Sequence, residues 1–331
     1  MILITGAAGY IGSHCVLNLL ENGYNVILFD NLEIGHFETV KTLQKLDLKG
    51  QIVDFVQGDL KVFDDINTVF KQHKIRGVIH FAANSLVEES IKNPQKYYEN
   101  NVLGSQNLFK AMIENNVLKM VFSSSAAVYG VVEDAVIDEN YFKKPINPYG
   151  DSKLKTENIL SDYDKTHGLK SIIFRYFNVA GADSLGRVGE KHNPETHLIP
   201  NLLKATLEGG KTFKLFGDDY ETKDGTCIRD YVNVEDLAEA HRLGLEKLFS
   251  ENASGIYNLG TQDGFSVKEI FEMCEKVTGK KINFEICPKR VGDPPKLVAN
   301  SLKAQEELNW MPKRTIFDTI KSAYEWESRS I

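Results

Sequence analysis

The stretch Ile2-Leu3-Ile4-Thr5-Gly6-Ala7-Ala8-Gly9-Tyr10-Ile11-Gly12 decides the fold of this chain. A short apolar run leads directly into three glycines with Gly-x-x-Gly-x-x-Gly spacing. Gly6 permits a tight strand-to-helix turn, Gly9 lets the backbone approach a pyrophosphate, and Gly12 lets the helix pack closely on the strand. The N-terminus of that helix would face the phosphates. The opening therefore predicts a dinucleotide site.

The first half of the chain alternates short apolar runs with longer amphipathic stretches, which is the rhythm of βαβ units. Strands are expected at Ile2–Thr5, Asn25–Asp30, Ile52–Val56, Gly77–Ala83, Lys119–Ser125 and Ser171–Phe177. Helices are expected up to Asn22 and near Phe63–Lys74, Pro94–Asn115 and Tyr149–His167. Strands this apolar suit a parallel sheet that is covered on both faces. We expect an α/β fold with a Rossmann-type, doubly wound parallel sheet in residues 1–177.

The amino-acid composition changes after Asn178. Residues 181–200 are rich in Gly, Pro, Asp and His, as expected of substrate loops or a domain crossover. Helices are expected near His197–Glu208, Val234–Leu248 and Val267–Thr278, with short strands such as Thr212–Phe216 and Gly255–Gly260. We expect residues 178–331 to form a smaller C-terminal α/β substrate lobe, from which some segments return to the first domain.

Composition excludes several classes of protein. Of the 331 residues, 42% are hydrophobic and 26% charged, and no apolar run approaches the roughly 20 residues that a membrane span needs. The first strand begins directly after Met1, which leaves no room for a signal peptide, so we expect a cytoplasmic protein. A net charge of -7 argues against nucleic acid or an anionic membrane as partner.

The four cysteines are scattered. Cys15, Cys227, Cys274 and Cys287 show neither Cys-x-x-Cys nor His-Cys ligand spacing. Reduced packing cysteines are therefore expected, with no disulfide and no metal site.

Two carboxylates bear on the choice of dinucleotide. Asp30 ends the second expected strand, 18 residues after Gly12, where its carboxylate would accept hydrogen bonds from ribose hydroxyls and repel a 2′-phosphate. NAD is therefore favoured over NADP. Asp59, after the third strand, is placed to accept from the adenine amino group. Taken singly, each would more often be a loop carboxylate or a helix cap.

Tyr149 and Lys153 share one helix face because they are four residues apart. A nearby ammonium and a positively charged nicotinamide would both favour the phenolate of Tyr149, making it a plausible base. Ser125, at the end of an expected strand, can share a hydrogen bond with Tyr149 and a substrate hydroxyl. Without the glycine-rich opening, the better reading would be a surface Tyr-Lys pair and a strand-end serine.

With these motifs in place, nearly the whole chain resembles the extended short-chain dehydrogenase/reductases and, within them, the UDP-glucose (UDP-galactose) 4-epimerases. In the first half the resemblance includes Asp30-Asn31-Leu32, Ile79–Ala83, Tyr97–Val102, Phe122–Gly130 and Arg175–Ala182. In the second half it includes Phe216–Tyr220, Asp224-Gly225-Thr226, Arg229-Asp230-Tyr231, Tyr257–Gly260 and Arg290–Asp293.

The resemblance implies an isomerase of galactose and carbohydrate metabolism that holds NAD tightly. Tyr149 would take the proton of the sugar 4-hydroxyl while the C4 hydride passes to the nicotinamide. The resulting 4-keto sugar would turn over and receive the hydride on its other face, so UDP-glucose and UDP-galactose interconvert without net oxidation. Lys153 would lower the pKa of Tyr149 and hold the nicotinamide ribose, and Ser125 would carry the proton.

The same resemblance implies two sets of binding residues. The cofactor would contact Gly6, Gly9, Tyr10, Ile11, Gly12, Asp30, Asn31, Asp59, Leu60, Phe81, Ala82, Ala83, Asn100, Ser123, Tyr149, Lys153 and Phe177. The substrate would contact Ser125, Tyr149, Asn178, His197, Leu198, Phe216, Arg229, Arg290, Asp293 and Leu297. Within this set, Arg229 and Arg290 would grip the diphosphate with charge-assisted hydrogen bonds. A salt bridge of Arg229 with Asp230 and a solvated Arg290 are the alternatives.

Three positions depart from the family pattern. Ser85 stands where some members have Lys near the nicotinamide ribose. His197 stands where some have Asn near the substrate, and either a phosphate contact or a capping or packing role is open to it. Leu297 resembles the gate of the hexose pocket, which is Tyr in members restricted to simple hexoses and small in those that accept N-acetylated sugars. Its intermediate size leaves N-acetyl tolerance open.

Several alternatives remain beside the epimerase reading. A nucleotide-sugar 4,6-dehydratase would need an acid and a base after Ser125, where this chain has Ala126-Ala127. A non-catalytic NAD-sensing scaffold and a net dehydrogenase are also compatible with the fold. A homodimer is implied through the helices near Pro94–Asn115 and Tyr149–His167, although an apolar stripe there could equally face the core.

Overall fold

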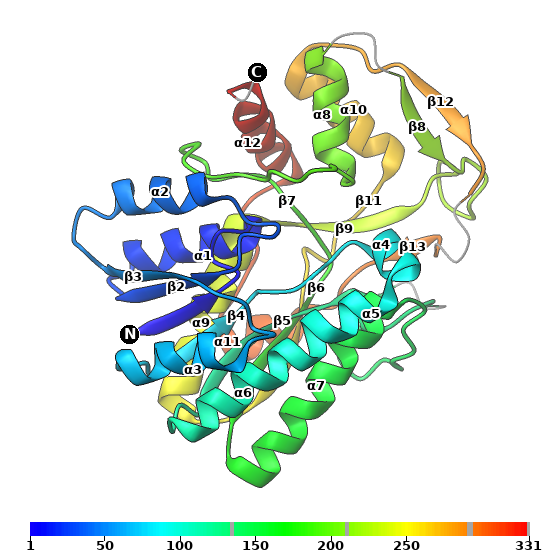
Figure 1. The fold of residues 1–331 in the computed structure, drawn as a ribbon. Coiled ribbons are helices and arrows are strands. Elements are labelled where there is room, and N and C mark those ends of the chain that lie inside the picture. Colours follow the sequence, from blue (N-terminus) through cyan, green and yellow to red (C-terminus); the bar gives the residue numbers. More distant parts are fainter. Residues whose placement is uncertain (133–135, 209–211, 290–293, 330–331) are drawn as a thin grey trace.

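The computed structural model describes residues 1–132, 136–208, 212–289 and 294–329 (Figure 1). Its centre is a sheet in which every neighbouring pair of strands is parallel, in the order β10-β6-β5-β4-β1-β2-β3. The strands are β1 (Ile2–Thr5), β2 (Val26–Asp30), β3 (Ile52–Gln57), β4 (Gly77–His80), β5 (Lys119–Ser125), β6 (Lys170–Tyr176) and β10 (Gly255–Leu259). The order runs outward in both directions from β1 and β4, so the predicted Rossmann-type, doubly wound class is confirmed.

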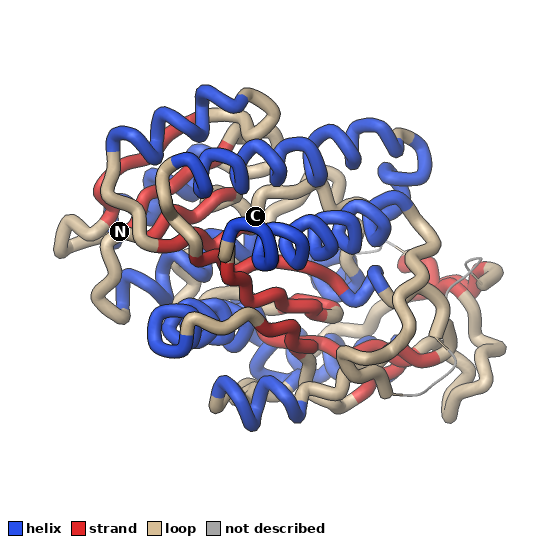
Figure 2. Tube along the Cα trace, turned by 90° about the horizontal axis from the view of Figure 1, so that it is seen from below, coloured by secondary structure: helices blue, strands red, loops and turns tan. Residues whose placement is uncertain are grey.

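Helices cover both faces of this sheet, as Figure 2 shows. One face carries α1 (Tyr10–Glu21), α2 (Phe37–Leu46) and α9 (Val234–Glu251) over a buried cluster that includes Ile4 and Leu28. The other carries α3 (Phe63–Gln72), α6 (Gly104–Glu114) and α7 (Pro148–His167) over a cluster that includes Leu3 and Phe29. Adjacent residues of one strand thus pack into opposite layers, as the alternation of side chains along a buried strand requires.

Part of the chain after Asn178 belongs to the first sheet. Strand β10 pairs with β6 along its whole length, for example Tyr257 with Phe174. Helix α9 packs against α1, and α11 (Leu302–Leu308) packs against β10. The division at Asn178 remains a sequence-based expectation, but these elements place the edge of the parallel sheet in the second half of the sequence.

The remaining elements after Asn178 form a separate lobe, at the upper right of Figure 1. One sheet joins β7 (Asn178–Ala180), β9 (Ile228–Asn233), β11 (Gly264–Ser266) and β13 (Lys296–Leu297), and β8 (Phe213–Phe216) pairs with β12 (Phe284–Cys287). Helices α8 (Leu198–Glu208), α10 (Val267–Thr278) and α12 (Ile316–Ser328) enclose its core, which includes Leu202, Ile270 and Ile320. Among the described residues, no helix is both long and apolar enough to cross a bilayer.

The stretch expected as one helix near Pro94–Asn115 is interrupted. It consists of α5 (Pro94–Tyr97), a π-helical turn at Tyr98–Leu103 and α6, and it follows the short α4 (Val87–Lys92). Inside the turn, buried Asn101 accepts a hydrogen bond from the backbone N–H of Asn84 at 2.8 Å and donates to the Asn84 carbonyl at 3.0 Å. These bonds fasten the helix to the loop that follows β4, on the rim of the central cleft.

Candidate active site

The glycine-rich turn is closed by contacts that exclude side chains. Gly6 has φ 71°, and a Cβ there would lie 2.7 Å from the backbone N of Ala82. A Cβ on Gly12 would lie 2.1 Å from the carbonyl O of Gly6. Gly9 precedes α1 without a side-chain cap, so the first amides of that helix lack a side-chain acceptor. This cradle suits the pyrophosphate of a dinucleotide, which could accept hydrogen bonds from such amides.

Asp30 closes the cradle from the end of β2. Its carboxylate accepts hydrogen bonds from the backbone N–H groups of Ala8, at 3.0 Å, and Leu32, at 2.8 Å. Burial raises the pKa of Asp30, and these two hydrogen bonds oppose the rise. Asp59 lies across the same cleft, where Asn31 donates to it at 3.5 Å. Both carboxylates line the cleft, and their contacts with an adenosine remain predictions.

Helix α7 starts in direct contact with the turn that follows β5. Asn147 caps it by accepting from the N–H of Gly150 at 2.9 Å, and Pro148 occupies its first turn. A Cβ on Gly150 would lie 2.4 Å from the carbonyl O of Ala127. Only glycine allows this approach, and it brings Tyr149 to Ser125, the last residue of β5.

Ser125, Tyr149 and Lys153 meet on the wall of one cleft. Ser125 hydrogen-bonds the phenol of Tyr149. Lys153 lies one turn further along α7, with its Nζ 6.0 Å from the centre of the Tyr149 ring. That ammonium also donates to the carbonyl of Ser123 at 2.8 Å, which fixes its position at the end of β5.

Burial dominates the acidity of this group. It lowers the pKa of Lys153 to about 7, although the nearby Glu157 opposes the shift. It raises the pKa of Tyr149 above that of a free phenol, and the hydrogen bond with Ser125 only partly compensates. From the sequence, Lys153 is expected to lower the pKa of Tyr149. This effect stays a prediction, because Lys153 itself is only partly charged near neutral pH.

The cleft encloses about 360 Å³, within the range of small-molecule sites. Its lining includes each residue that the sequence analysis assigns to the cofactor, from Gly6 to Phe177. Of the expected substrate contacts, it includes Ser125, Tyr149, Asn178, His197 and Leu198. The roles of these residues remain predictions.

Three other expected substrate contacts, Phe216, Arg229 and Leu297, are described residues outside this lining. Phe216 ends β8, while Arg229 on β9 is the register partner of Leu297 on β13. Arg229 is buried and donates to the carbonyl of Ile228 at 2.7 Å. Arg290 and Asp293 lie outside the described residues.

Known proteins resemble this chain over almost its full length. Residues 2–260 match the model of the NAD dependent epimerase/dehydratase family. The UDP-glucose 4-epimerase of Halalkalibacterium halodurans is 49% identical over 98% of this chain and 95% of its own. That of Lactobacillus helveticus is 48% identical over 98% of this chain and 96% of its own. The chain belongs to the UDP-glucose 4-epimerase family.

Solved structures agree with this membership. The crystal structure of UDP-glucose 4-epimerase from Brucella ovis, in complex with NAD, superimposes with a TM-score of 0.92. It is 40% identical, and the match covers 98% of each chain. The resemblance to UDP-glucose 4-epimerases that the sequence carries is thereby confirmed.

His197 is a member of an ion cluster in this UDP-glucose 4-epimerase family member. Its Nδ1 lies 2.5 Å from Oε1 of Glu190 and 3.3 Å from Oε1 of Glu195. Burial alone would lower the pKa of His197, but the two carboxylates raise it to about 10. His197 and Ser85 both line the cleft, so two of the three departures from the family pattern fall on its wall, while Leu297 does not.

Sequence reasoning passed over other residues of the lining. They include Glu33, Ile34 and Gly35, which follow the Asp30-Asn31-Leu32 motif, and His192. For the first three the signal was their position directly after a strand that ends in Asp30. For His192 the signal was the spacing Glu190-x-His192-x-x-Glu195-x-His197. This pattern contains no cysteine, so the spacing of the cysteines does not indicate it.

Proposed function

We propose that this chain interconverts UDP-glucose and UDP-galactose by reversible 4-epimerisation, as a cytoplasmic enzyme of galactose metabolism. The observation that carries the proposal is the convergence of Ser125, Tyr149 and Lys153 on the cleft that the glycine-rich turn also lines. Membership of the UDP-glucose 4-epimerase family and the NAD complex of the Brucella ovis relative support NAD as the cofactor. The closed cradle of Gly6 and Gly12 fits that group, and Asp30 favours its unphosphorylated ribose.

Tyr149 acts as the base that removes the proton of the sugar 4-hydroxyl. Burial raises its pKa above that of a free phenol, so the phenolate depends on added positive charge. Bound NAD would accept the C4 hydride in its oxidised form and return it in its reduced form. The oxidised form would also supply a positive charge. Lys153 adds a second cation from the same helix, and its contact with Ser123 keeps it there. Ser125 completes the proton path between substrate and phenol.

Epimerisation requires the 4-keto sugar to turn over while the nucleotide stays bound. Arg229, with Arg290, would hold the diphosphate, Asn178 would add a neutral donor, and Phe216 would line the uracil pocket. His197, directly before α8, lines the same cleft and would complete this wall. In this proposal Leu198 belongs to the same wall, and Asp293 to the loop beside the nucleotide.

Other activities fit the described residues less well. Dehydration across C5 and C6 needs further acid and base groups, and the turn Ala126–Val128 directly after Ser125 is aliphatic. A scaffold without activity would not need the buried Lys153, whose desolvation is costly. N-acetylated UDP-hexoses are the remaining alternative substrates, and they depend on the space beside Leu297.

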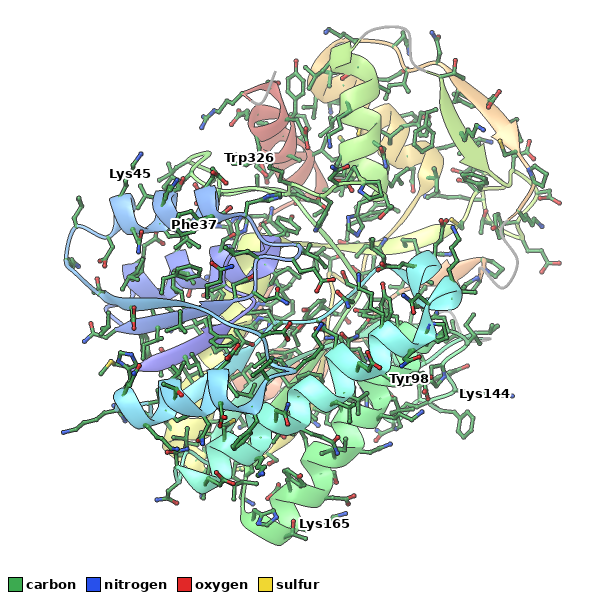
Figure 3. The ribbon with its side chains drawn as sticks, in the orientation of Figure 1. Phe37, Lys45, Tyr98, Lys144, Lys165 and Trp326 are labelled. Atoms are coloured by element: carbon green, nitrogen blue, oxygen red, sulfur yellow. The ribbon has the colours of Figure 1, made fainter. Side chains whose placement is uncertain are left out.

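We also propose a homodimer that pairs through α6 and α7. Tyr98, which is labelled in Figure 3, donates a hydrogen bond to Asp151 of α7 at 2.7 Å. This bond joins the π-helical turn to α7. Leu103, directly before α6, and Ile91, on α4, which packs against α7, expose 54% and 63% of their surface. Exposed large apolar side chains beside both helices favour an interaction site there.

Proton NMR of the anomeric region tests the activity. Purified protein without added cofactor is mixed with UDP-galactose, and the signals of UDP-glucose are expected to grow until equilibrium. Tyr149→Phe should slow this conversion by about 10²- to 10⁴-fold, because the proton acceptor is lost. Tyr163→Phe is the matched control on the same helix, since Tyr163 packs edge-on against Phe109 rather than in the cleft.

No conversion by the wild-type protein, even with NAD supplied, would exclude this epimerisation as its main activity. Conversion that Tyr149→Phe leaves unchanged would exclude Tyr149 as the base. Release of free reduced cofactor in step with a keto sugar would point instead to a net dehydrogenase.

A further inference from the structure

Two histidines and two glutamates converge in the segment that leads into α8. They are Glu190, His192, Glu195 and His197, and one ligand atom from each lies within 4.8 Å of the other three. The carboxylates are almost completely buried, with 5% and 6% of the side-chain surface of Glu190 and Glu195 exposed. Imidazole and carboxylate groups of this kind are the usual ligands of zinc in proteins.

The separations of the ligand atoms fit a single tetrahedral ion. The Nδ1 of His192 lies 3.0 Å from Glu190 Oε1 and 3.8 Å from Glu195 Oε2. The Nδ1 of His197 lies 2.5 Å and 3.3 Å from the Oε1 atoms of the same two residues. Ligands bonded tetrahedrally at about 2.0–2.2 Å stand about 3.3–3.6 Å from one another. The three separations that involve Glu190 Oε1 and Glu195 Oε2, the oxygens proposed as ligands, range from 2.5 to 3.8 Å around that value.

One carboxylate oxygen is left without a hydrogen-bond donor. Glu195 Oε1 accepts from the backbone N–H groups of Thr196 and His197, both at 2.8 Å. Its Oε2 is buried and accepts no hydrogen bond from the described residues, since His192 Nδ1 at 3.8 Å and Lys204 Nζ at 3.9 Å are too distant. Hydrogen bonds and ion pairs among the four side chains therefore do not satisfy the cluster, whereas a cation bonded to Oε2 would.

We propose that Glu190, His192, Glu195 and His197 bind one Zn²⁺ ion in a closed, structural site. Two neutral imidazoles and two carboxylates would balance the charge of the ion. A mixed nitrogen and oxygen set favours zinc over magnesium or calcium, which prefer six or more oxygen ligands. The scattered cysteines give no hint of this site, and it goes beyond the proposed epimerase activity.

The ion would fasten the crossover segment between the two lobes. The carbonyl of Glu190 accepts a hydrogen bond from Trp326 of α12 at 2.8 Å, and Trp326 lies beside this segment in Figure 3. The ring of His192 packs edge-on against Tyr10 of the glycine-rich turn, with centroids 6.3 Å apart. His197 leads into α8 on the cleft wall. One ion would thus tie α12 and the start of α8 to the cofactor side of the cleft.

Metal binding to the full chain tests the proposal without reference to activity. Protein without a histidine tag is stripped with a chelator and titrated with Zn²⁺ by calorimetry, and with Co²⁺ by visible absorption. One ion per chain is expected, with the strong absorption of tetrahedral Co²⁺. His192→Ala and Glu195→Gln should each weaken Zn²⁺ binding at least about 10-fold, since each removes or weakens a ligand. Mg²⁺ should not compete.

His73→Ala is the matched control. His73 also pairs with a carboxylate, Asp54 at 3.1 Å, but it belongs to the end of α3 and is not a member of the cluster, so Zn²⁺ affinity should stay unchanged. X-ray absorption at the zinc edge of the wild-type protein avoids any dependence on the folding of a variant, and should show two imidazoles and two oxygens at about 2.0–2.2 Å. Binding that survives both substitutions, an octahedral Co²⁺ spectrum or no stoichiometric binding would overturn the proposal.

Discussion

Glu157 and Arg175 form a bidentate ion pair that joins helix α7 to strand β6 below the active site. Arg175 Nε lies 2.9 Å from Oε1 and Nη2 lies 2.6 Å from Oε2 of Glu157. Both side chains are buried, and Ser124 also donates to Glu157 at 2.5 Å. Because Glu157 follows Lys153 by one helical turn, this pair fixes the helix that carries both Tyr149 and Lys153.

Breaking this pair from one side should destabilise the fold strongly. Glu157→Gln leaves the Arg175 charge buried without a counter-ion, and we expect a loss of about 3 kcal/mol in the free energy of unfolding. Chemical denaturation followed by circular dichroism measures the loss. The exposed pair of Lys165 with Asp162 on the same helix is the control, and Asp162→Asn should cost less than about 1 kcal/mol. Equal losses in the two variants would contradict the assigned role of the buried pair.

The buried Lys153 predicts a pH dependence of stability. Its pKa is lowered to about 7 in the folded chain, against about 10.4 when unfolded, so between these values the unfolded state binds more protons. The contribution of Lys153 to stability therefore rises with pH from about 7 to about 10, and levels off below pH 7. Measured on cofactor-free protein, the unfolding free energy of Lys153→Met should rise less with pH than that of wild type. Parallel curves would show that Lys153 is charged in the folded chain throughout.

Leu297 predicts the tolerance for N-acetylated sugars. It packs against a cluster that contains Ala126, Val128 and Phe177, next to the turn that follows Ser125. Leu297→Tyr should reduce kcat/KM for UDP-N-acetylglucosamine relative to UDP-glucose by about 10-fold or more, and Leu297→Ala should raise it, because the pocket is filled or enlarged. Leu302→Ala, at an exposed position on α11, should leave the ratio unchanged. An unchanged ratio in both Leu297 variants would remove this residue from the hexose pocket.

The proposed dimer predicts that charge at its centre will separate the subunits. Leu103→Glu, directly before α6, and Ile91→Glu, on α4 beside α7, replace exposed apolar side chains by carboxylates, and the mass by light scattering should fall from two chains to one. Phe142→Glu, at a site that is also exposed but lies in the loop before α7, is the control and should stay dimeric. A monomeric wild type would refute the interface outright.

The sequence predicts the strand-and-helix alternation well because the apolar runs are short and their breaks are sharp. It does not predict that β10 borders β6, since a strand segment carries no mark of the partner it meets some 80 residues away. The π-helical turn is also invisible in the sequence, because Asn101 fits an amphipathic helix until its hydrogen bonds to Asn84 are seen.

For the site, the sequence predicts residues at the carboxyl ends of strands, such as Asp30 and Ser125. The sequence does not predict the pKa values of these residues, because the burial that lowers the pKa of Lys153 depends on packing from β5 and α7 together. The Glu-His cluster has a compact sequence signature, yet only the fold of the crossover segment turns Glu190 and His197 toward each other.

The π-helical turn also has a rotational consequence. Each residue in a helix turns the side-chain direction by about 100°, so one residue more or less in Tyr98–Leu103 would swing everything that follows on α6 by that angle. The wide turn thus sets the direction in which the side chains of α6 point. About two and three turns after Asn101, Leu108 and Met112 lie buried in the core, so the angle of this turn relates the rim of the cleft to the core. A regular α-helix through Tyr98–Leu103 would change that angle, because it turns further per residue than a π-helix does.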